Sequence, residues 1–326
     1  MIVPEYWAEA IRDTRHKGRR LVVRRFGWSD DSVAAAQAHA ELRVQEALDT
    51  LLQGQDVPRR ERLTNYGVDG VPIREQIVER QDDLVITRNS YGALCLNTPN
   101  VLFADIDHPP LPTTWALSPV LTVVLWSGLW VLGANLLNGT AGFLLAAVVV
   151  IALNALMLRR TKRNTQRRAQ LETQALARVE RFSAKHPDWH LRTYRTPAGL
   201  RVLVMHATFS PHDDEVQQLF AALHTDKLYM RMCRVQHCFR ARLTPKPWRV
   251  GVRRRIRPPF AAWSAEQAFR PDRLQWIAEY ERRARGHAAC SFLRAYGNEA
   301  QVDAKAEVVR AVHDRMTQAY ASLPLA

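Results

Sequence analysis

The clearest pattern along the chain is an apolar stretch from Trp115 to Leu158 that contains no Asp, Glu, Lys, Arg or His. It is too long for one membrane crossing, because ~20 helical residues span the hydrocarbon core. The turn-forming residues Asn138, Gly139 and Thr140 divide it. The pattern therefore predicts a two-helix transmembrane hairpin within residues 113–160. Its helices are expected at residues 116–137 and 141–158.

The N-terminal portion, residues 1–112, is predicted to contain one helix followed by strands. After a short amphipathic piece and a strand candidate at residues 19–26, the sequence Ser-Asp-Asp-Ser at residues 29–32 caps a helix that ends near Leu52. Short apolar segments separated by turn residues then predict an antiparallel meander. Its strands are expected at residues 84–88, 93–97 and 101–105.

The C-terminal portion, residues 161–326, also mixes helices and strands. The pattern predicts a polar helix, two strands around a Thr-Pro-Ala-Gly turn, a further helix and a helix-rich remainder. These first four elements are expected at residues 165–185, 190–195, 200–207 and 213–224. Strands on both sides of the hairpin predict one cytoplasmic α+β domain that the hairpin interrupts, with the two flanking portions folding together.

The charges next to the hairpin predict its orientation. Six basic residues follow the second predicted helix, and such clusters remain in the cytoplasm. They are Arg159, Arg160, Lys162, Arg163, Arg167 and Arg168. With two crossings, both termini are cytoplasmic and the short turn faces outward. The sequence therefore predicts a multi-pass protein of the inner (plasma) membrane. A helical hairpin buried in a soluble core is the alternative, but it would normally show a polar outer face.

The net charge of +14 and the pI near 10.2 indicate an anionic neighbour. Residues 159–270 hold 24 Lys and Arg against 8 Asp and Glu. The predicted anion-binding residues are Arg195, Arg201, Arg240, Arg242, Lys246, Arg249, Arg253, Arg254 and Arg255. For an anchored chain the default partner is anionic lipid headgroups. Nucleic acid or a nucleotide is the less favoured alternative, because interleaved aromatic residues could stack on bases. No protein partner is indicated.

Asp105 and Asp107 are the sharpest candidates for chemistry. Carboxylates two residues apart at the end of a strand project to the same side. Such a pair can hold Mg²⁺ or Mn²⁺ against a phosphate. The alternative is a strand end closed by polar turn residues, because Asp-x-Asp is a common sequence.

The sequence Val-Leu-Phe-Ala-Asp-Ile-Asp at residues 101–107, then a helix and strands with a Gly-and-basic turn, resembles the archaeo-eukaryotic primase-polymerase superfamily. The resemblance implies a metal-dependent nucleotidyl transfer. It matches Asp105 and Asp107 to the family's metal ligands and His206 to its nucleotide-contacting histidine. It covers about a fifth of the chain. The family's small-x-His signature and a third acidic ligand are not identifiable here.

Two other interpretations bear on the same segments. Asp-x-Asp is also similar to the motif with which glycosyltransferases hold a sugar nucleotide, although a βαβ half should then precede it. Residues 86–107 and 192–203 resemble segments of bacterial membrane proteins whose function is not assigned, which implies nothing about activity.

Cysteine usage adds one further candidate site. Four cysteines in this length form no disulfide framework, which suits a reducing compartment. Cys233, His237 and Cys238 suggest a zinc site with His287 and Cys290 as distant partners, but their spacing is loose. A buried thiol beside a hydrogen-bonded histidine explains them equally well. The leading prediction is a membrane-anchored protein with a basic ligand- or partner-binding domain, and metal-dependent phosphoryl transfer is the alternative.

Overall fold

The computed structural model describes residues 3–16, 18–61, 70–111, 119–136, 138–258 and 263–326. The chain divides into two compact units. The larger unit comprises Met1–Asp107 and Arg178–Ala326, and the smaller unit, His108–Ala177, is inserted between these two segments of the sequence. The larger unit is a mixed α+β fold whose strands all pair antiparallel within their sheets, as the sequence predicts.

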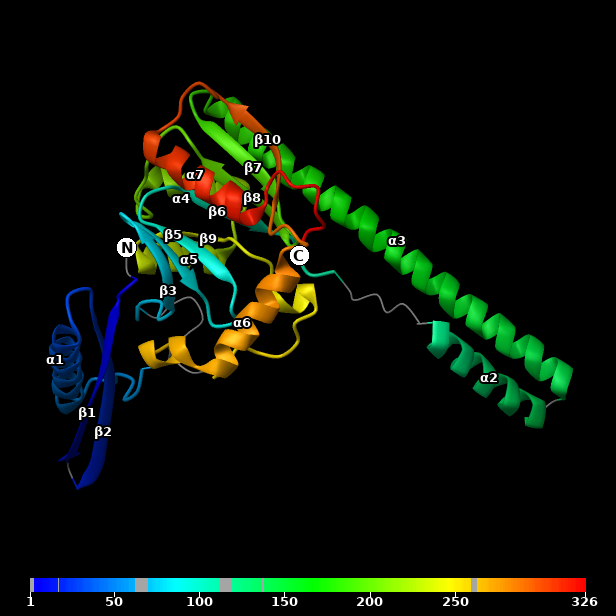
Figure 1. Cartoon of the computed structure of the whole chain (residues 1–326), viewed down its shortest axis with the longest axis horizontal. Helices are drawn as coiled ribbons and strands as arrows, with labels where there is room; N and C mark the ends of the chain where they lie inside the picture. The colour runs from blue at the N-terminus through cyan, green and yellow to red at the C-terminus, as the bar shows by residue number, and fades with distance from the viewer. Residues whose placement is uncertain (1–2, 17, 62–69, 112–118, 137, 259–262) are drawn as a thin grey trace. The chain divides into compact units, whose positions relative to one another are not determined.

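The larger unit begins with a two-stranded hairpin covered by one helix, drawn in blue in Figure 1. The hairpin strands are β1 (Tyr6–His16) and β2 (Arg19–Ser29), and the helix is α1 (Val33–Leu52). The Ser32 hydroxyl caps α1 by accepting a hydrogen bond of 3.1 Å from the Ala35 amide, which confirms the predicted helix start. Strand β1 was predicted only as an amphipathic piece. Its charged residues obscure the alternation that identifies a strand, because much of β1 is exposed.

Helix α1 lies very close to the hairpin at Gly27. A Cβ atom at this position would lie 2.2 Å from the Ala36 carbonyl oxygen and 2.3 Å from the Ala40 nitrogen. Both neighbouring alanines are fully buried. Only glycine therefore allows the backbones of β2 and α1 to approach this closely.

The first four-stranded sheet contains the predicted meander. Its order is β3-β4-β5-β9, so the consecutive strands β3, β4 and β5 pair with one another. The strands are β3 (Gln76–Gln81), β4 (Leu84–Arg88), β5 (Leu94–Thr98) and β9 (Phe239–Arg242). Strand β9 was not predicted, because the sequence after residue 224 was expected to be rich in helices.

The second sheet, of order β10-β7-β8-β6, corrects the predicted meander. Strand β6 (Phe103–Asp107) was expected beside β5, but it pairs with β8 in this sheet. Residues 101–104 are all completely buried, so both faces of the chain are covered here. An uninterrupted apolar run carries no alternation that would identify its partner strand. The remaining strands are β7 (His190–Arg195), β8 (Gly199–Val204) and β10 (Ser291–Gly297).

The helices of the C-terminal portion connect the two sheets. Helix α5 follows the edge of β6, where the Tyr229 hydroxyl donates to the Phe103 carbonyl at 3.1 Å and the Asp226 amide donates to the Asp105 carbonyl at 3.0 Å. Backbone groups at this edge are thus satisfied by a helix instead of a further strand. The elements are α4 (Asp214–Leu223), α5 (Lys227–Gln236), η1 (Pro247–Val250), η2 (Ala265–Phe269), α6 (Pro271–Ala284) and α7 (Ala304–Thr317).

The smaller unit contains helix α2 (Pro119–Leu136) and the first part of α3 (Gly139–Lys185). The helices approach most closely at two glycines: a Cβ atom on Gly133 would lie 2.7 Å from the Gly142 Cα atom. The sequence predicts this close approach of small residues. The amide side chains of Asn135 and Asn154 bond to carbonyls of their own helices, at 2.8 and 2.9 Å.

Helix α3 differs from the prediction in length. The predicted apolar helix and the polar helix after it form one continuous helix of 47 residues, because no Gly or Pro interrupts residues 143–185. Among the described residues, α3 is the one helix long and apolar enough to cross a membrane. The apolar run of α2, Val120–Leu136, is shorter, so the predicted pair of membrane-spanning helices is not confirmed.

The close approach at Gly27 generates a stability prediction. The Gly27→Ala variant should lose about 1–3 kcal/mol of unfolding free energy, because the added methyl group must separate β2 from α1. Thermal unfolding of the purified chain, followed by circular dichroism, measures the change. Gly286→Ala is the matched control, because nothing lies within 4 Å of a Cβ atom there. Equal midpoints for the two variants would contradict the packing argument.

Candidate functional site

The predicted aspartate pair lies at the end of β6. Asp105 stands opposite Arg201 of β8 in the sheet register, and Asp107 stands opposite Gly199. The Arg201 guanidinium binds both carboxylate oxygens of Asp105, with Nε–Oδ1 and Nη2–Oδ2 distances of 2.8 and 3.1 Å. Arg201 is only 3% exposed. The Asp105 carboxylate is thus the partner of a buried cation, which it stabilises through a two-point ion pair.

The same guanidinium extends into a buried polar network. Its Nη1 atom donates to the Arg242 carbonyl of β9 at 2.9 Å and lies 3.4 Å from the His313 Nε2 atom. The other ring nitrogen of His313 lies 2.9 Å from an Asp314 carboxylate oxygen. Arg201 therefore links the two four-stranded sheets to α7. Its position assigns it to the architecture of the larger unit, although it was predicted to bind an external anion.

Asp107 has different surroundings, because its side chain is exposed at the end of β6. Partial burial raises the pKa of Asp107, and the neighbouring carboxylates of Asp105 and Asp226 raise it further. The positive charges of Lys246 and Arg242 act in the opposite direction. Partial burial and the nearby guanidinium of Arg242 lower the pKa of Lys246. The fold thus brings together acidic and basic groups that the sequence predicted separately.

His206 does not join this cluster. It follows β8 on the side away from Gly199, and five residues separate it from Arg201, which corresponds to roughly 16 Å of extended chain. Its ring packs against Trp189 and Phe209, with centroid distances of 4.6 and 5.5 Å. Burial among these groups lowers the pKa of His206. The convergence of histidine and aspartates that the primase-polymerase resemblance implies is not formed.

No metal centre is evident in the described part of the chain, where no group of three His, Cys, Asp or Glu side chains is placed to hold an ion. Cys233 and Cys238 are completely buried, and burial raises the pKa of Cys238 to about 11. His237 is exposed and lies against His212, whereas the distant candidate Cys290 lies 3.8 Å from His313. The predicted zinc ligands are therefore not brought together.

The remaining predicted anion-binding residues are dispersed over the fold. Arg240 is buried and binds both carboxylate oxygens of Glu75, at 2.9 and 2.7 Å, and the Asn97 side chain at 3.1 Å. This guanidinium is therefore an internal ion-pair partner, like Arg201. Arg242, Lys246 and Arg249 are half-buried near the end of β9, while Arg195, Arg253, Arg254 and Arg255 are exposed.

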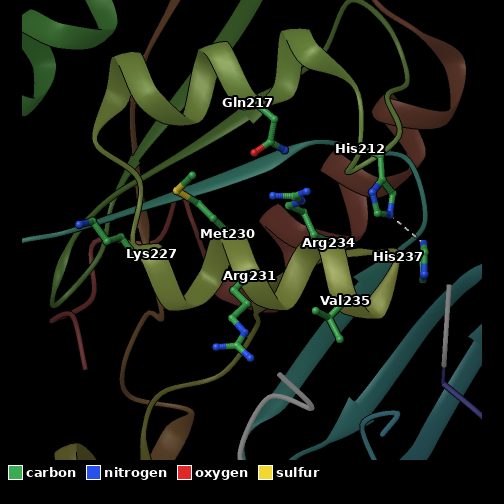
Figure 2. A pocket seen from close by; sticks show the side chains of 8 residues that line it. All are labelled: His212, Gln217, Lys227, Met230, Arg231, Arg234, Val235 and His237. Carbon is green, nitrogen blue, oxygen red and sulfur yellow. Dashed lines mark hydrogen bonds between the residues drawn. The ribbon is translucent and has the colours of Figure 1, made fainter. Parts of the chain in front are cut away.

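A pocket with a volume of about 490 Å³ lies between α4 and α5, and its lining contains three cations and no carboxylate (Figure 2). The cations are Lys227, Arg231 and Arg234 of α5. They form no salt bridge with any residue that the structure describes. The other lining residues are His212, Gln217, Met230, Val235 and His237.

Two histidines stand at one end of this pocket. His212 precedes α4, and His237 ends α5 in the left-handed conformation, with φ of 49°. Their ring nitrogens, Nε2 of His212 and Nδ1 of His237, are 2.9 Å apart, which is hydrogen-bond distance. Loss of water and the adjacent His212 lower the pKa of His237. The two rings thus form a hydrogen-bonded pair beside the cations of α5.

Sequence reasoning missed this pocket, although a signal was present. Lys227, Arg231 and Arg234 are spaced at i, i+4 and i+7, which places them along one side of a helix. The remainder after residue 224 was predicted to be helix-rich, but these three cations were not among the predicted anion-binding residues. The contribution of His212 depends on a contact between segments 25 residues apart and has no local signal.

Comparisons with protein-family models, with curated proteins and with solved structures found no match to this chain.

The Asp105–Arg201 pair generates the second prediction. The Asp105→Asn variant should lose about 3 kcal/mol of unfolding free energy, because it leaves the buried guanidinium of Arg201 without its anion. Denaturant unfolding of the purified chain measures this loss.

Asp107→Asn is the matched control, with the opposite expectation. Because the pKa of Asp107 is raised in the folded chain, its ionised form is disfavoured by the fold, and stability is lost as the pH rises through that pKa. The Asn variant should therefore unfold at a slightly higher temperature than the wild type near pH 7, and at the same temperature below the ordinary aspartate pKa of about 3.9. An equal loss of stability in both variants would refute the distinction between them.

Proposed function

We propose that the chain is an integral membrane protein that holds its α+β unit, as a ligand- or partner-binding domain, at the cytoplasmic face of the inner membrane. The observation that carries this proposal is the composition of α3 along its length. An 18-residue window of α3 has a mean hydropathy of 2.5, and only 17% of that window is buried. A core helix of a soluble protein would be mostly buried, so the exposed apolar surface favours lipid as its environment.

The basic segment of α3 follows its apolar part without a break in the helix. Its six Lys and Arg side chains, between Arg159 and Arg168, are all exposed. Basic residues close to an anionic leaflet contribute ~1 kcal/mol each to its attraction. The positive-inside bias then assigns this segment, and the α+β unit that follows it, to the cytoplasm.

Helix α2 would complete a two-crossing hairpin. Its contact with α3 uses small residues, as membrane helix pairs do: Gly133 and Gly142 meet, and Ala146 is buried. Trp126 and Trp130 lie against Phe143 with centroid distances of 5.0 and 5.9 Å. Two crossings return the chain to its starting side, so both parts of the α+β unit lie on one face.

Metal-dependent phosphoryl transfer remains the alternative function, and the cluster around Asp107 is the observation that favours it. Asp107 is exposed beside Lys246 and Arg242, which would suit a phosphate and a divalent cation. The pairing of Asp105 with Arg201 speaks against it, because that carboxylate is already neutralised. If Asp107→Asn abolished Mn²⁺ binding measured by electron paramagnetic resonance, the alternative would gain support over the binding role.

Membrane extraction tests the anchoring proposal. The full chain should remain in the membrane pellet after washing with alkaline carbonate, which removes peripheral proteins. Lysine at Leu144, Val148 and Ile151 should release it, because each charge at the centre of a membrane helix costs about 2.5–3.5 kcal/mol. These three side chains are 64, 64 and 67% exposed, so the substitutions disturb little internal packing.

Lysine at three exposed polar positions of the same helix, Gln166, Gln170 and Gln174, is the matched control and should stay in the pellet. Wild-type chain that appears in the supernatant would refute the anchoring proposal.

Cysteine labelling tests the two-crossing topology separately. The four native cysteines are buried, so an introduced exposed thiol reports its own location. Cysteine at Asn138, between α2 and α3, should react with a membrane-impermeant maleimide in intact cells. Cysteine at Gln174 should react only after the membrane is permeabilised. Protection of the Asn138→Cys thiol in intact cells would contradict the two-crossing hairpin while leaving a single anchor intact.

A further inference from the structure

The cations of the larger unit differ in whether a carboxylate of the same unit binds them. Arg201 and Arg240, the two most buried of the predicted anion-binding residues, each bind a carboxylate through two contacts. Lys227, Arg231 and Arg234 on α5 are exposed and form no salt bridge with the described residues. Three cations along one helix face repel one another, and an external anion would relieve that repulsion.

We propose that the pocket between α4 and α5 is a binding site for a phosphate monoester. In Figure 2 the Arg234 side chain rises from α5 towards α4, between Met230 and His212, while Lys227 and Arg231 extend towards other sides of the pocket. A guanidinium presents several N–H donors in a fork that fits phosphate oxygens. Arg234 is therefore the central phosphate ligand, and the other two cations supply long-range attraction.

The histidine pair adds a donor that does not depend on the tautomer. One ring donates to the other across the 2.9 Å contact between His212 Nε2 and His237 Nδ1. If His212 donates, the outer nitrogen of His237 carries the second proton; if His237 donates, the outer nitrogen of His212 carries it. In either case at least one outward N–H group is present. The pair thus supplies a hydrogen-bond donor at the end of the pocket beside Arg234.

The size and the remaining lining identify the class of ligand. A volume of about 490 Å³ falls within the range of small-molecule sites, about 300–1,000 Å³, and exceeds what a bare phosphate ion occupies. Met230 and Val235 supply apolar surface next to the cations, and Gln217 supplies a polar group from α4. The ligand is therefore a phosphate group attached to a larger organic body, either a soluble ester or the headgroup of a lipid such as phosphatidic acid.

Titration calorimetry with phenyl phosphate, on the full chain in a neutral detergent, tests the proposal. Phenyl phosphate should bind, and Arg234→Gln should weaken its binding about tenfold, because a charge-assisted hydrogen bond is lost. Combined Lys227→Gln, Arg231→Gln and Arg234→Gln should weaken it by at least about 100-fold. Arg282→Gln, Arg285→Gln and Arg315→Gln, all at exposed positions, remove the same charge elsewhere and should leave binding unchanged.

Four results would overturn the proposal, and the first three concern phenyl phosphate and phenyl sulfate. They are the absence of phenyl phosphate binding, equal weakening in the two triple variants, and equal affinity for phenyl sulfate, which has the same shape but a single negative charge. Tighter binding of a single-stranded oligonucleotide through the same three residues would also overturn it, because phosphodiesters would then be the ligand.

Lipid nanodiscs distinguish the two sources of the phosphate. Competition with phenyl phosphate by nanodiscs that contain phosphatidic acid, but not by those that contain phosphatidylglycerol, would support a lipid headgroup. Absence of competition by either, with phenyl phosphate binding intact, would support a soluble ester. The test does not depend on membrane anchoring, because binding is measured on the solubilised chain.

Discussion

The ion pair between Asp105 and Arg201 holds the centre of the α+β unit together. Arg201 lies in β8, its carboxylate partner lies in the adjacent β6, and its second hydrogen bond reaches the Arg242 carbonyl of β9 in the other sheet. A guanidinium that is 3% exposed keeps its charge in the interior, so the fold is destabilised when its anion is removed. The contact between the sheets therefore depends on a carboxylate and a guanidinium that are 96 residues apart in the chain. The inserted residues 108–177 lie between them in the sequence, so the two parts of the unit must fold together.

Local signals in the sequence were sufficient for several elements. Strand β4 was predicted at residues 84–88 from a short apolar segment next to turn residues, and α1 begins after the predicted serine cap. Partner choice was not predictable in the same way. Strand β6 pairs in the second sheet and not within the meander. Its completely buried apolar residues suit either neighbouring strand, so the sequence does not identify the partner. The continuity of α3 was missed because a change from apolar to polar residues was taken as an end, although no helix-breaking residue occurs there.

The candidate chemistry was harder to predict than the fold, for a related reason. The spacing of Asp105 and Asp107 correctly indicates two carboxylates at a strand end, but it cannot show what stands opposite them. The register brings Arg201 beside Asp105, and it leaves Asp107 at the exposed end. His206 does not lie beside either aspartate, because it follows the end of β8 that is away from Gly199. Composition alone likewise could not tell the paired arginines, such as Arg240 with Glu75, from the cations of α5, which form no salt bridge with a described residue.

The excess positive charge of the chain consequently separates into two kinds with different physical meanings. Cations such as Arg201 and Arg240 are buried, and each is matched by a carboxylate, so they contribute to folding and are closed to any ligand. The six cations of α3 between Arg159 and Arg168, and those of Lys227, Arg231 and Arg234 on α5, are exposed. A positive surface potential attracts anions, whether these lie in a membrane leaflet or in solution. The proposals for lipid attraction and for phosphate binding therefore rest on the exposed cations of α3 and α5, and not on the buried ones.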